Sequence, residues 1–280
     1  MQFGLGICSS LGFYPLRENE FLSARSDSPP GNRRQRWKMA ANPLRHKKKT
    51  AAATPARGDT VRNRLKSAGR TYLANDNISE FLKPGDLAAI EQEVERCAGA
   101  ILDALVIDTE NDHNTRGTAK RLAKMFVHEV FAGRYLPPPK CTDFPNVTSM
   151  DEIYVVGPIT VRSACSHHLC PIEGEVWFGV IPGERVIGLS KFSRIANWIL
   201  SRPQIQEEAV MQLADEVERI ISPRGLAVVL SARHSCMTWR GVKEDATAMT
   251  TSVMRGIFRD GPAARAEVLS LIQAKGFRCQ

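Results

Sequence analysis

Apolar residues recur at steps of three and four positions in several segments of the chain, and this spacing predicts amphipathic helices. The clearest segment follows Pro84-Gly85-Asp86 and places five apolar residues on one helical face: Leu87, Ile90, Val94, Cys97 and Ile101. A second helix is expected from Thr118 to Gly133, since glycine commonly ends a helix. Further helices are expected over 190–201, 203–221 and 263–274.

Runs rich in β-branched and aromatic residues predict strands, because these side chains suit a pleated and half-buried surface. Such runs cover 153–161, 173–181, 226–232 and 251–258, and Pro182-Gly183 supplies a turn. Strands and helices are segregated along the chain rather than alternating. The pattern therefore favours an α+β fold with an antiparallel sheet backed by helices.

Residues 1–70 differ from the rest in composition, with basic clusters and few positions that could bury an apolar face. We expect this extension to be disordered, followed by a helical region at 71–145 and a domain at 146–280 that holds the predicted sheet. Its Arg-rich, acid-poor composition also fits an organelle transit peptide or an interaction tail.

Charge and composition narrow the class of protein. Residues 1–70 hold fifteen Lys/Arg and four Asp/Glu, a net +11, so the chain's overall +8 leaves the remaining residues at −3. Nucleic-acid binding by the folded part is therefore not expected. No apolar run approaches the roughly 20 residues of a membrane helix. Seven scattered cysteines indicate a reducing compartment, and we expect a cytoplasmic protein.

Two short segments carry residues suited to a metal. Cys165, His167, His168 and Cys170 lie within six positions, and His234 and Cys236 follow about seventy residues later. Thiolate and imidazole are ligands that Zn²⁺ prefers, and three protein ligands leave one position for water. Cys165, one adjacent histidine and Cys236 could form such a split site, leaving a histidine on each side for acid–base work. Buried cysteines and surface histidines with no metal are the plainer alternative.

Several cations surround these segments in the sequence. Lys191 and Arg194 open a helix one turn apart, which is typical of an anion site but equally of a solvated face. Arg240 follows Cys236 by four residues, while Arg121 and Lys124 share a helical face.

Together and in this order, these clusters resemble the GTP cyclohydrolase I family over roughly residues 85–275. The resemblance rests on Ser163-Ala-Cys165-Ser-His167-His168, Gly188-Leu-Ser190-Lys191-x-x-Arg194, Arg202-Pro-Gln204-x-Gln206-Glu207 and His234-x-Cys236-Met-x-x-Arg240-Gly241, with Thr118-Ala-Lys-Arg121-Leu-Ala-Lys124-Met before them.

The resemblance implies a T-fold subunit and a toroidal homodecamer with active sites between subunits. It implies that Cys165, His168 and Cys236 bind Zn²⁺, and that His167 and His234 transfer protons. The implied reaction converts GTP and water into 7,8-dihydroneopterin triphosphate and formate. The family positions that hold the triphosphate and ribose are matched by Ser190, Lys191, Arg194, Arg240, Arg121 and Lys124. The position that recognises guanine is matched by Glu207. Glu208 is expected at the surface.

The chain departs from the family's usual pattern at a few positions. Ser166 stands where the family usually has Glu, and Gly117 and Ala119 stand where it has Glu and Pro, which predicts a looser helix start. Cys170 is additional and is expected to be a buried thiol, and Trp239 is expected to pack.

Three alternatives remain on the sequence. The chain could be a non-catalytic T-fold protein with structural zinc, although His167 and His234 are both present. It could bind RNA through its basic extension, although it has no RNA-binding motif with aromatic platforms. It could also stop the reaction at a formamidopyrimidine intermediate.

Overall fold

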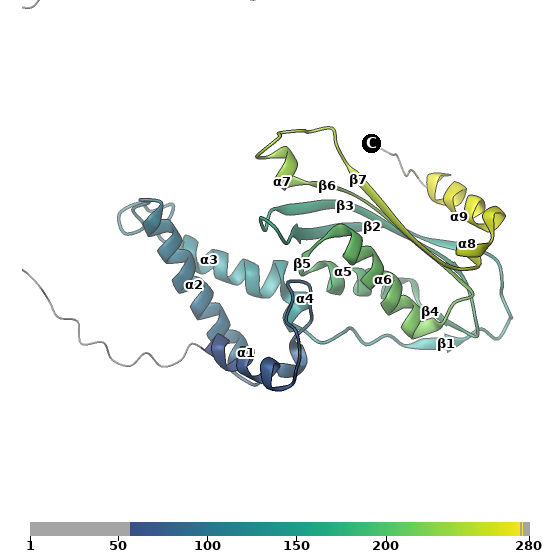
Figure 1. Ribbon diagram of the computed structural model, residues 1–280, viewed down its shortest axis with the longest axis horizontal. Helices are drawn as coiled ribbons and strands as arrows, with labels where there is room; N and C mark the ends of the chain where they lie inside the picture. The colour runs from purple at the N-terminus through teal and green to yellow at the C-terminus, as the bar shows by residue number, and fades with distance from the viewer. Residues whose placement is uncertain (1–56, 275, 277–280) are drawn as a thin grey trace, which may run out of the picture. The chain divides into compact units, whose positions relative to one another are not determined.

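The computed structural model describes residues 57–274 and residue 276. Within this part, a five-stranded sheet has the strand order β5-β2-β3-β6-β7 (Figure 1). The four long strands pair antiparallel, and β5 runs parallel to β2. Their bounds are Tyr154–Cys165 (β2), Pro171–Ile181 (β3), Pro203–Gln204 (β5), Gly225–His234 (β6) and Met249–Gly256 (β7). The predicted α+β class with an antiparallel sheet is confirmed.

Strand register brings the two chemically interesting segments to one end of the sheet. Ile172 near the start of β3 pairs with Ser163 of β2 on one side and with His234 of β6 on the other. The segment after Ser163 and the segment after His234 therefore leave the sheet at the same end.

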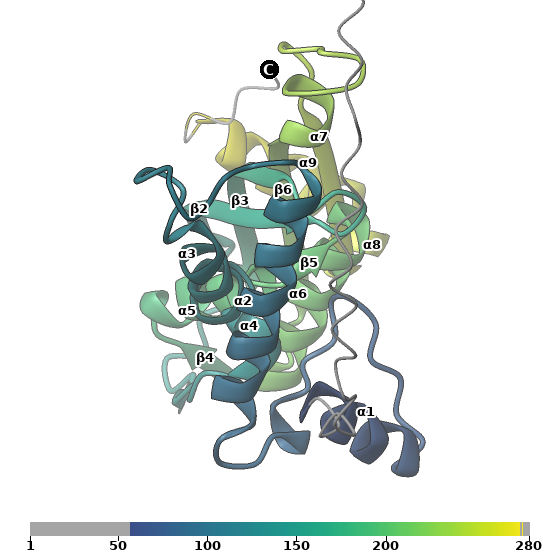
Figure 2. The same ribbon diagram turned by 90° about the vertical axis from the view of Figure 1, so that its left-hand side faces the viewer.

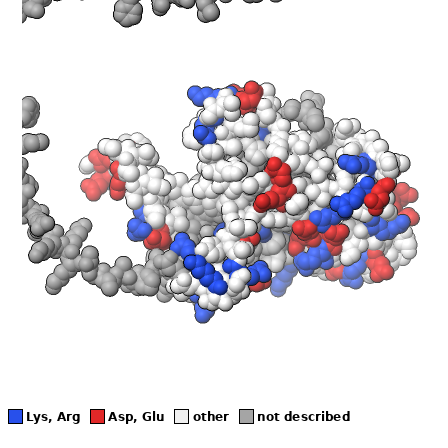
Figure 3. Space-filling view, viewed as in Figure 1, with Lys and Arg blue, Asp and Glu red and all other residues white. Residues whose placement is uncertain are grey.

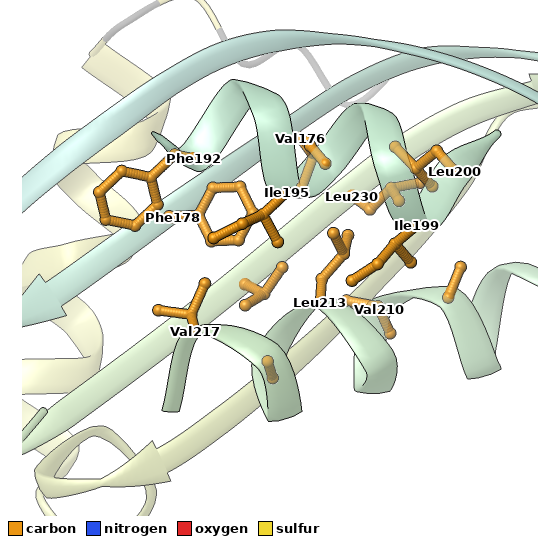
Figure 4. Close-up of a cluster of buried hydrophobic side chains, with 14 of the residues drawn as sticks. Val176, Phe178, Phe192, Ile195, Ile199, Leu200, Val210, Leu213, Val217 and Leu230 are labelled. Carbon is orange, nitrogen blue, oxygen red and sulfur yellow. The ribbon is translucent and has the colours of Figure 1, made fainter. Parts of the chain in front are cut away.

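Successive side chains of β3 point to opposite faces of the sheet, and each face has its own hydrophobic cluster. Phe178 faces helices α5 (Leu189–Leu200) and α6 (Gln206–Ile221), and its ring centroid lies 5.3 Å from that of Phe192 (Figure 4). Its neighbour Trp177 belongs to a second cluster under α8 (Ile257–Asp260) and α9 (Pro262–Ala274). The sheet is thus covered by helices on both faces.

A group of helices precedes the sheet, and α3 packs against α2 (Figure 2). It comprises α1 (Arg57–Ser67), the 3₁₀ turn η1 (Ser79–Phe81), α2 (Asp86–Ala104), α3 (Thr118–Lys124), the π-helix η2 (Met125–Val130) and α4 (Ala132–Tyr135). The predicted apolar face of α2 is only partly covered within this chain, since Ile101 is 60% exposed.

Helix α1 lies within the segment 1–70 that is predicted to be disordered. Val61 and Leu65 of this helix are buried against Ile78, with Ile90 and Tyr135 packed around them. Two apolar residues in a basic helix suffice because other helices supply the rest of the cluster. Residues 1–56, the greater part of the predicted extension, lie outside the described residues.

Three predicted boundaries differ from the structure. The helix expected from 203 begins at Gln206, because Pro203 and Gln204 add a short strand beside β2. The last strand ends at Gly256, where a positive φ of 54° turns the chain into α8. Gly133 ends no helix but lies inside α4, where its amide donates to the Ser201 carbonyl.

Besides β5, the predictions lacked two further short strands and the short helix α7 (Ser235–Thr238). β1 (Asp143–Pro145) pairs with β4 (Arg185–Ile187), and α7 follows β6. On the face shown in Figure 3, basic and acidic side chains are interspersed over the α6 side, and acidic ones gather at the α2–α3 tip. None of the described helices is long and apolar enough to cross a membrane.

Candidate metal centre and active site

The turn between β2 and β3 is held from both sides. The Cys165 amide donates to the Cys170 carbonyl, and the Leu169 amide donates to the Cys165 carbonyl, each over 2.8 Å. The Ser166 amide donates to the carbonyl of Gln204 in β5 over 2.9 Å. Leu169 has a φ of 54°, a left-handed conformation that side chains such as leucine rarely adopt. The turn therefore presents His167 and His168 from a well-tethered backbone.

Three side chains from the two segments meet beside this turn. One ligand atom each from Cys165, His168 and Cys236 lies within 4.8 Å of the other two. Zinc binds sulfur at about 2.3 Å and imidazole nitrogen at about 2.0–2.1 Å, so two ligands of one ion lie at most about 4.6 Å apart. The donor set therefore fits one ion with an open fourth position, and small side-chain movements would bring the three atoms to tetrahedral spacing.

Burial and a second thiol shape the electrostatics at Cys236. Burial, and next the neighbouring Cys165 thiol, raise the pKa of the Cys236 thiol. Both effects disfavour the thiolate as long as no cation compensates its charge. A divalent metal would reverse this, because it binds the deprotonated sulfur.

Two further histidines lie on the same two segments without belonging to this group. His167 is exposed, and its Nδ1 lies 3.6 Å from the Cys165 sulfur. His234 is half-buried, and its Nε2 lies 2.8 Å from Oε1 of Gln206. Burial lowers the pKa of His234, while the carboxylate of Glu207 acts in the opposite direction.

Arg240 and Glu207 lie close to this centre. Nη1 of Arg240 is 2.8 Å from Nε2 of His168. Glu207 is exposed in the first turn of α6, next to the buried Gln206. Glu208, expected at the surface, is exposed, and it also accepts a 2.6 Å hydrogen bond from Nδ2 of Asn75.

The other predicted binding residues lie on two more elements. Ser190, Lys191 and Arg194 occupy the start of α5, where the Lys191 ammonium donates to the Lys140 carbonyl. Arg121 and Lys124 are exposed on α3. Among the described residues, no hydrogen bond or ion pair joins these five side chains to the Cys165–His168–Cys236 group. Arg121 instead donates to the Asn114 carbonyl and to the Thr118 hydroxyl.

The structure gives the environment of three more residues near the centre. Cys170 is buried with its sulfur toward the His168 carbonyl, as expected of a buried thiol. Trp239 is 77% exposed, so the expectation that it packs is wrong, because the short α7 carries it away from the sheet. The contact of Gln206 with His234 was not predicted, since a glutamine that opens a helix has no signature of burial.

Comparison with known proteins agrees with the residue pattern. Residues 94–273 match the protein family described as GTP cyclohydrolase I. A protein named GTP cyclohydrolase 1 from Aliivibrio salmonicida is 36% identical over 215 residues, which are 76% of this chain and 95% of that protein. A protein of the same name from Rhodopirellula baltica is 38% identical over 187 residues, which are 67% of this chain and 79% of that protein. The one from Mycobacterium tuberculosis is 37% identical over 187 residues, which are 66% of this chain and 92% of that protein. Since the family match covers more than half of the chain, this protein belongs to the GTP cyclohydrolase I family.

Proposed function

We propose that this protein hydrolyses the imidazole ring of GTP, releases formate and closes a new ring to yield 7,8-dihydroneopterin triphosphate. Family membership supplies the reaction class. The observation that carries the assignment to residues is the convergence of Cys165, His168 and Cys236, with two further histidines beside them.

Cys165, His168 and Cys236 would hold the metal, and we assign it as Zn²⁺ because two thiolates and one imidazole suit that ion. When bound, Zn²⁺ supplies Lewis acidity that makes water nucleophilic near neutral pH. The ring opening at C8 of guanine requires such a nucleophile.

His167 and His234 would move the protons of the reaction. Ring opening, formate release and ring closure each need a proton at one nitrogen or oxygen and its removal at another. Two histidines that flank the ligand residues in the chain, His167 next to His168 and His234 two positions before Cys236, can serve as acid and base.

Binding of GTP would rest on the cations and on Glu207. The triphosphate carries about four negative charges, and Lys191, Arg194, Arg240, Arg121 and Lys124 offer five positive ones, with Ser190 beside them. The exposed carboxylate of Glu207 would accept hydrogen bonds from N1–H and the amino group of guanine, which adenine does not offer in this pattern.

The proposal extends to assembly and location. The cations of α3 are not joined to the ligand group within one chain, and Ile101 and Leu105 of the same helical region are 60% and 64% exposed. Both features support an assembly in which neighbouring subunits complete each site, and we propose the homodecamer that the resemblance implies. We assign the enzyme to the cytoplasm. Its product would enter folate, biopterin or 7-deazaguanine synthesis.

An assay on purified protein tests the function. Formate release, neopterin fluorescence after oxidation, and metal content would be measured together for wild type, His167→Ala and Cys236→Ala. We expect turnover with about one zinc per chain in wild type. His167→Ala should lose turnover and keep zinc, whereas Cys236→Ala should lose both.

Two outcomes would replace the proposal. Bound zinc with no formate from wild type would indicate a structural metal in a non-catalytic T-fold protein. Formate without neopterin would indicate a reaction that stops at the formamidopyrimidine.

A further inference from the structure

A buried glutamine connects the helical layer to the candidate active site. Gln206 is the first residue of α6 and is 2% exposed. Its side-chain nitrogen donates to the carbonyls of Met249 and Leu230 over 2.9 and 3.3 Å and to the Thr251 hydroxyl over 3.1 Å. Its side-chain oxygen lies 2.8 Å from Nε2 of His234.

These partners determine which way the amide faces. A backbone carbonyl can only accept a hydrogen bond, so the atom facing Met249 and Leu230 must be the –NH₂ group. The reverse orientation would place Oε1 against two carbonyl oxygens and leave a buried –NH₂ facing the imidazole. The hydrogen-bond acceptors around Gln206 therefore determine which side-chain atom is nitrogen and which is oxygen.

The orientation of the amide in turn decides the proton position on the imidazole. Oε1 of Gln206 has no hydrogen to donate, so a 2.8 Å contact with Nε2 requires that Nε2 carry the hydrogen. Neutral His234 then has its lone pair on Nδ1. The alternative tautomer would bring two acceptors together at a half-buried position.

We propose that Gln206 is a positioning residue that holds the His234 ring in its Nε2–H tautomer, so that Nδ1 is the ring nitrogen that keeps a free lone pair. The role of His234 in proton transfer rests on the proposed function, whereas the tautomer follows from the contacts of Gln206.

An amide suits this role better than a carboxylate would. A carboxylate facing an imidazole stabilises the imidazolium strongly, as in the Asp–His pair of serine proteases. The neutral oxygen of Gln206 orients the ring with much less bias toward the charged form. His234 can then act as base and acid in successive steps.

The first test uses the zinc-loaded wild-type protein with ¹⁵N-labelled histidine. Solid-state ¹⁵N spectra separate protonated from bare ring nitrogens, and a His234→Gln sample identifies the signals of His234. We expect a protonated Nε2 and a bare Nδ1. A bare Nε2 with a protonated Nδ1 would overturn the proposal, and this measurement needs no variant of Gln206 to fold.

The second test compares Gln206→Met with Gln204→Met. Gln204 is a similarly buried glutamine, 1% exposed, whose amide donates to the Ile199 carbonyl and to Gln212 rather than to His234. In Gln206→Met we expect mixed tautomers of His234 and a kcat lower by about 10- to 100-fold, within the range that positioned proton transfer contributes. KM for GTP should change by less than about threefold, because the substitution removes no residue that the proposal assigns to GTP binding.

Gln204→Met should keep the Nε2–H tautomer and the wild-type kcat. An unchanged tautomer and an unchanged kcat in Gln206→Met would contradict the proposal. Failure of the proposed function looks different, since wild type would then show the expected tautomer but release no formate from GTP.

Discussion

Arg240 donates a hydrogen bond to His168 through Nη1 and Nε2, which are 2.8 Å apart. Arginine has no acceptor, so this bond occupies the lone pair on Nε2. A histidine that binds a metal normally has its second nitrogen as a donor to an acceptor, the opposite polarity. Metal binding by His168 and the contact with Arg240 therefore exclude each other, and Arg240 must turn away from His168 when a metal binds.

Replacing Arg240 by methionine should therefore not weaken zinc binding. We expect Arg240→Met to bind zinc up to about tenfold more tightly, since one hydrogen bond contributes about 0.5–1.5 kcal/mol. Its KM for GTP should rise because a phosphate-binding cation is lost. Competition with a chelator of known affinity measures the first effect and steady-state kinetics the second.

Arg233→Met is the matched control, because Arg233 carries the same charge and donates instead to the Asp245 carbonyl. It should leave both quantities near wild type. Weaker zinc binding by Arg240→Met would show that the arginine supports the metal site.

Gly133 lies where helix α4 meets helix α5. A Cβ at this position would lie 1.9 Å from the Trp198 carbonyl oxygen and 2.9 Å from that of Ser201. Gly133→Ala must separate the helices and should lower the free energy of unfolding by about 1–3 kcal/mol. Urea unfolding at fixed protein concentration measures it.

Gly99→Ala is the control within helix α2. The nearest atom to its added Cβ is that of Ala119 at 3.9 Å, which is ordinary contact. This variant should be more stable by about 0.5–1 kcal/mol, because alanine favours helix over glycine. Equal unfolding midpoints for the two variants would contradict the close approach at Gly133.

Arg202 connects the segment before α2 to the helices beside the sheet. It is 5% exposed, donates to the carbonyls of Gly133 and Asn75, and lies 4.1 Å from the Trp198 ring centroid. Burial lowers the pKa of Arg202 to about 10, so the charge remains at neutral pH. Arg202→Met should lower the free energy of unfolding by about 1–3 kcal/mol, since it removes the donor to the Asn75 carbonyl and one of the two donors to the Gly133 carbonyl, which also accepts from Asn77.

An exposed arginine offers the comparison. Arg219 pairs with Glu216 and its side chain is 65% exposed, so Arg219→Met should change stability by less than about 1 kcal/mol. A similar small effect at Arg202 would mean that water replaces its hydrogen bonds.

Much of this architecture could be predicted because it depends on local sequence patterns, namely the spacing of apolar residues and short motifs. The period of apolar residues located α5, α6, β3 and β6, and the motif residues predicted a GTP cyclohydrolase I, which the family match confirms. The α+β sheet backed by helices is the T-fold of that family, as predicted. The grouping of Cys165, His168 and Cys236 followed from the same motifs, because register brings the ends of β2 and β6 together.

The features that the sequence did not predict depend on contacts between segments far apart in the chain. Gln206 gains its role only when β6 and β7 supply three acceptors above it. Gly133 marks a close approach to α5, which no local signal separates from a helix stop. The roles of His167, His234 and the phosphate-binding cations stay predictions, to be tested by the assays above.

Helix α1 offers the last test, because its composition predicted disorder and its packing indicates order. Leu65 is 2% exposed against Ile78, and Arg64 of the same helix forms an ion pair with the buried Asp86. Leu65→Ala should lower the free energy of unfolding of this region by about 2–3 kcal/mol, as expected for a truncated core leucine.

Hydrogen exchange of the amides over 61–67 measures this local stability directly. We expect protected amides in wild type and faster exchange in Leu65→Ala, while amides of β3 exchange as before. Lys66→Ala is the control, since Lys66 is exposed one position further along the same helix. Wild-type exchange at the rate of an unfolded peptide would show that α1 is not docked, and that the expected disorder of residues 1–70 extends through it.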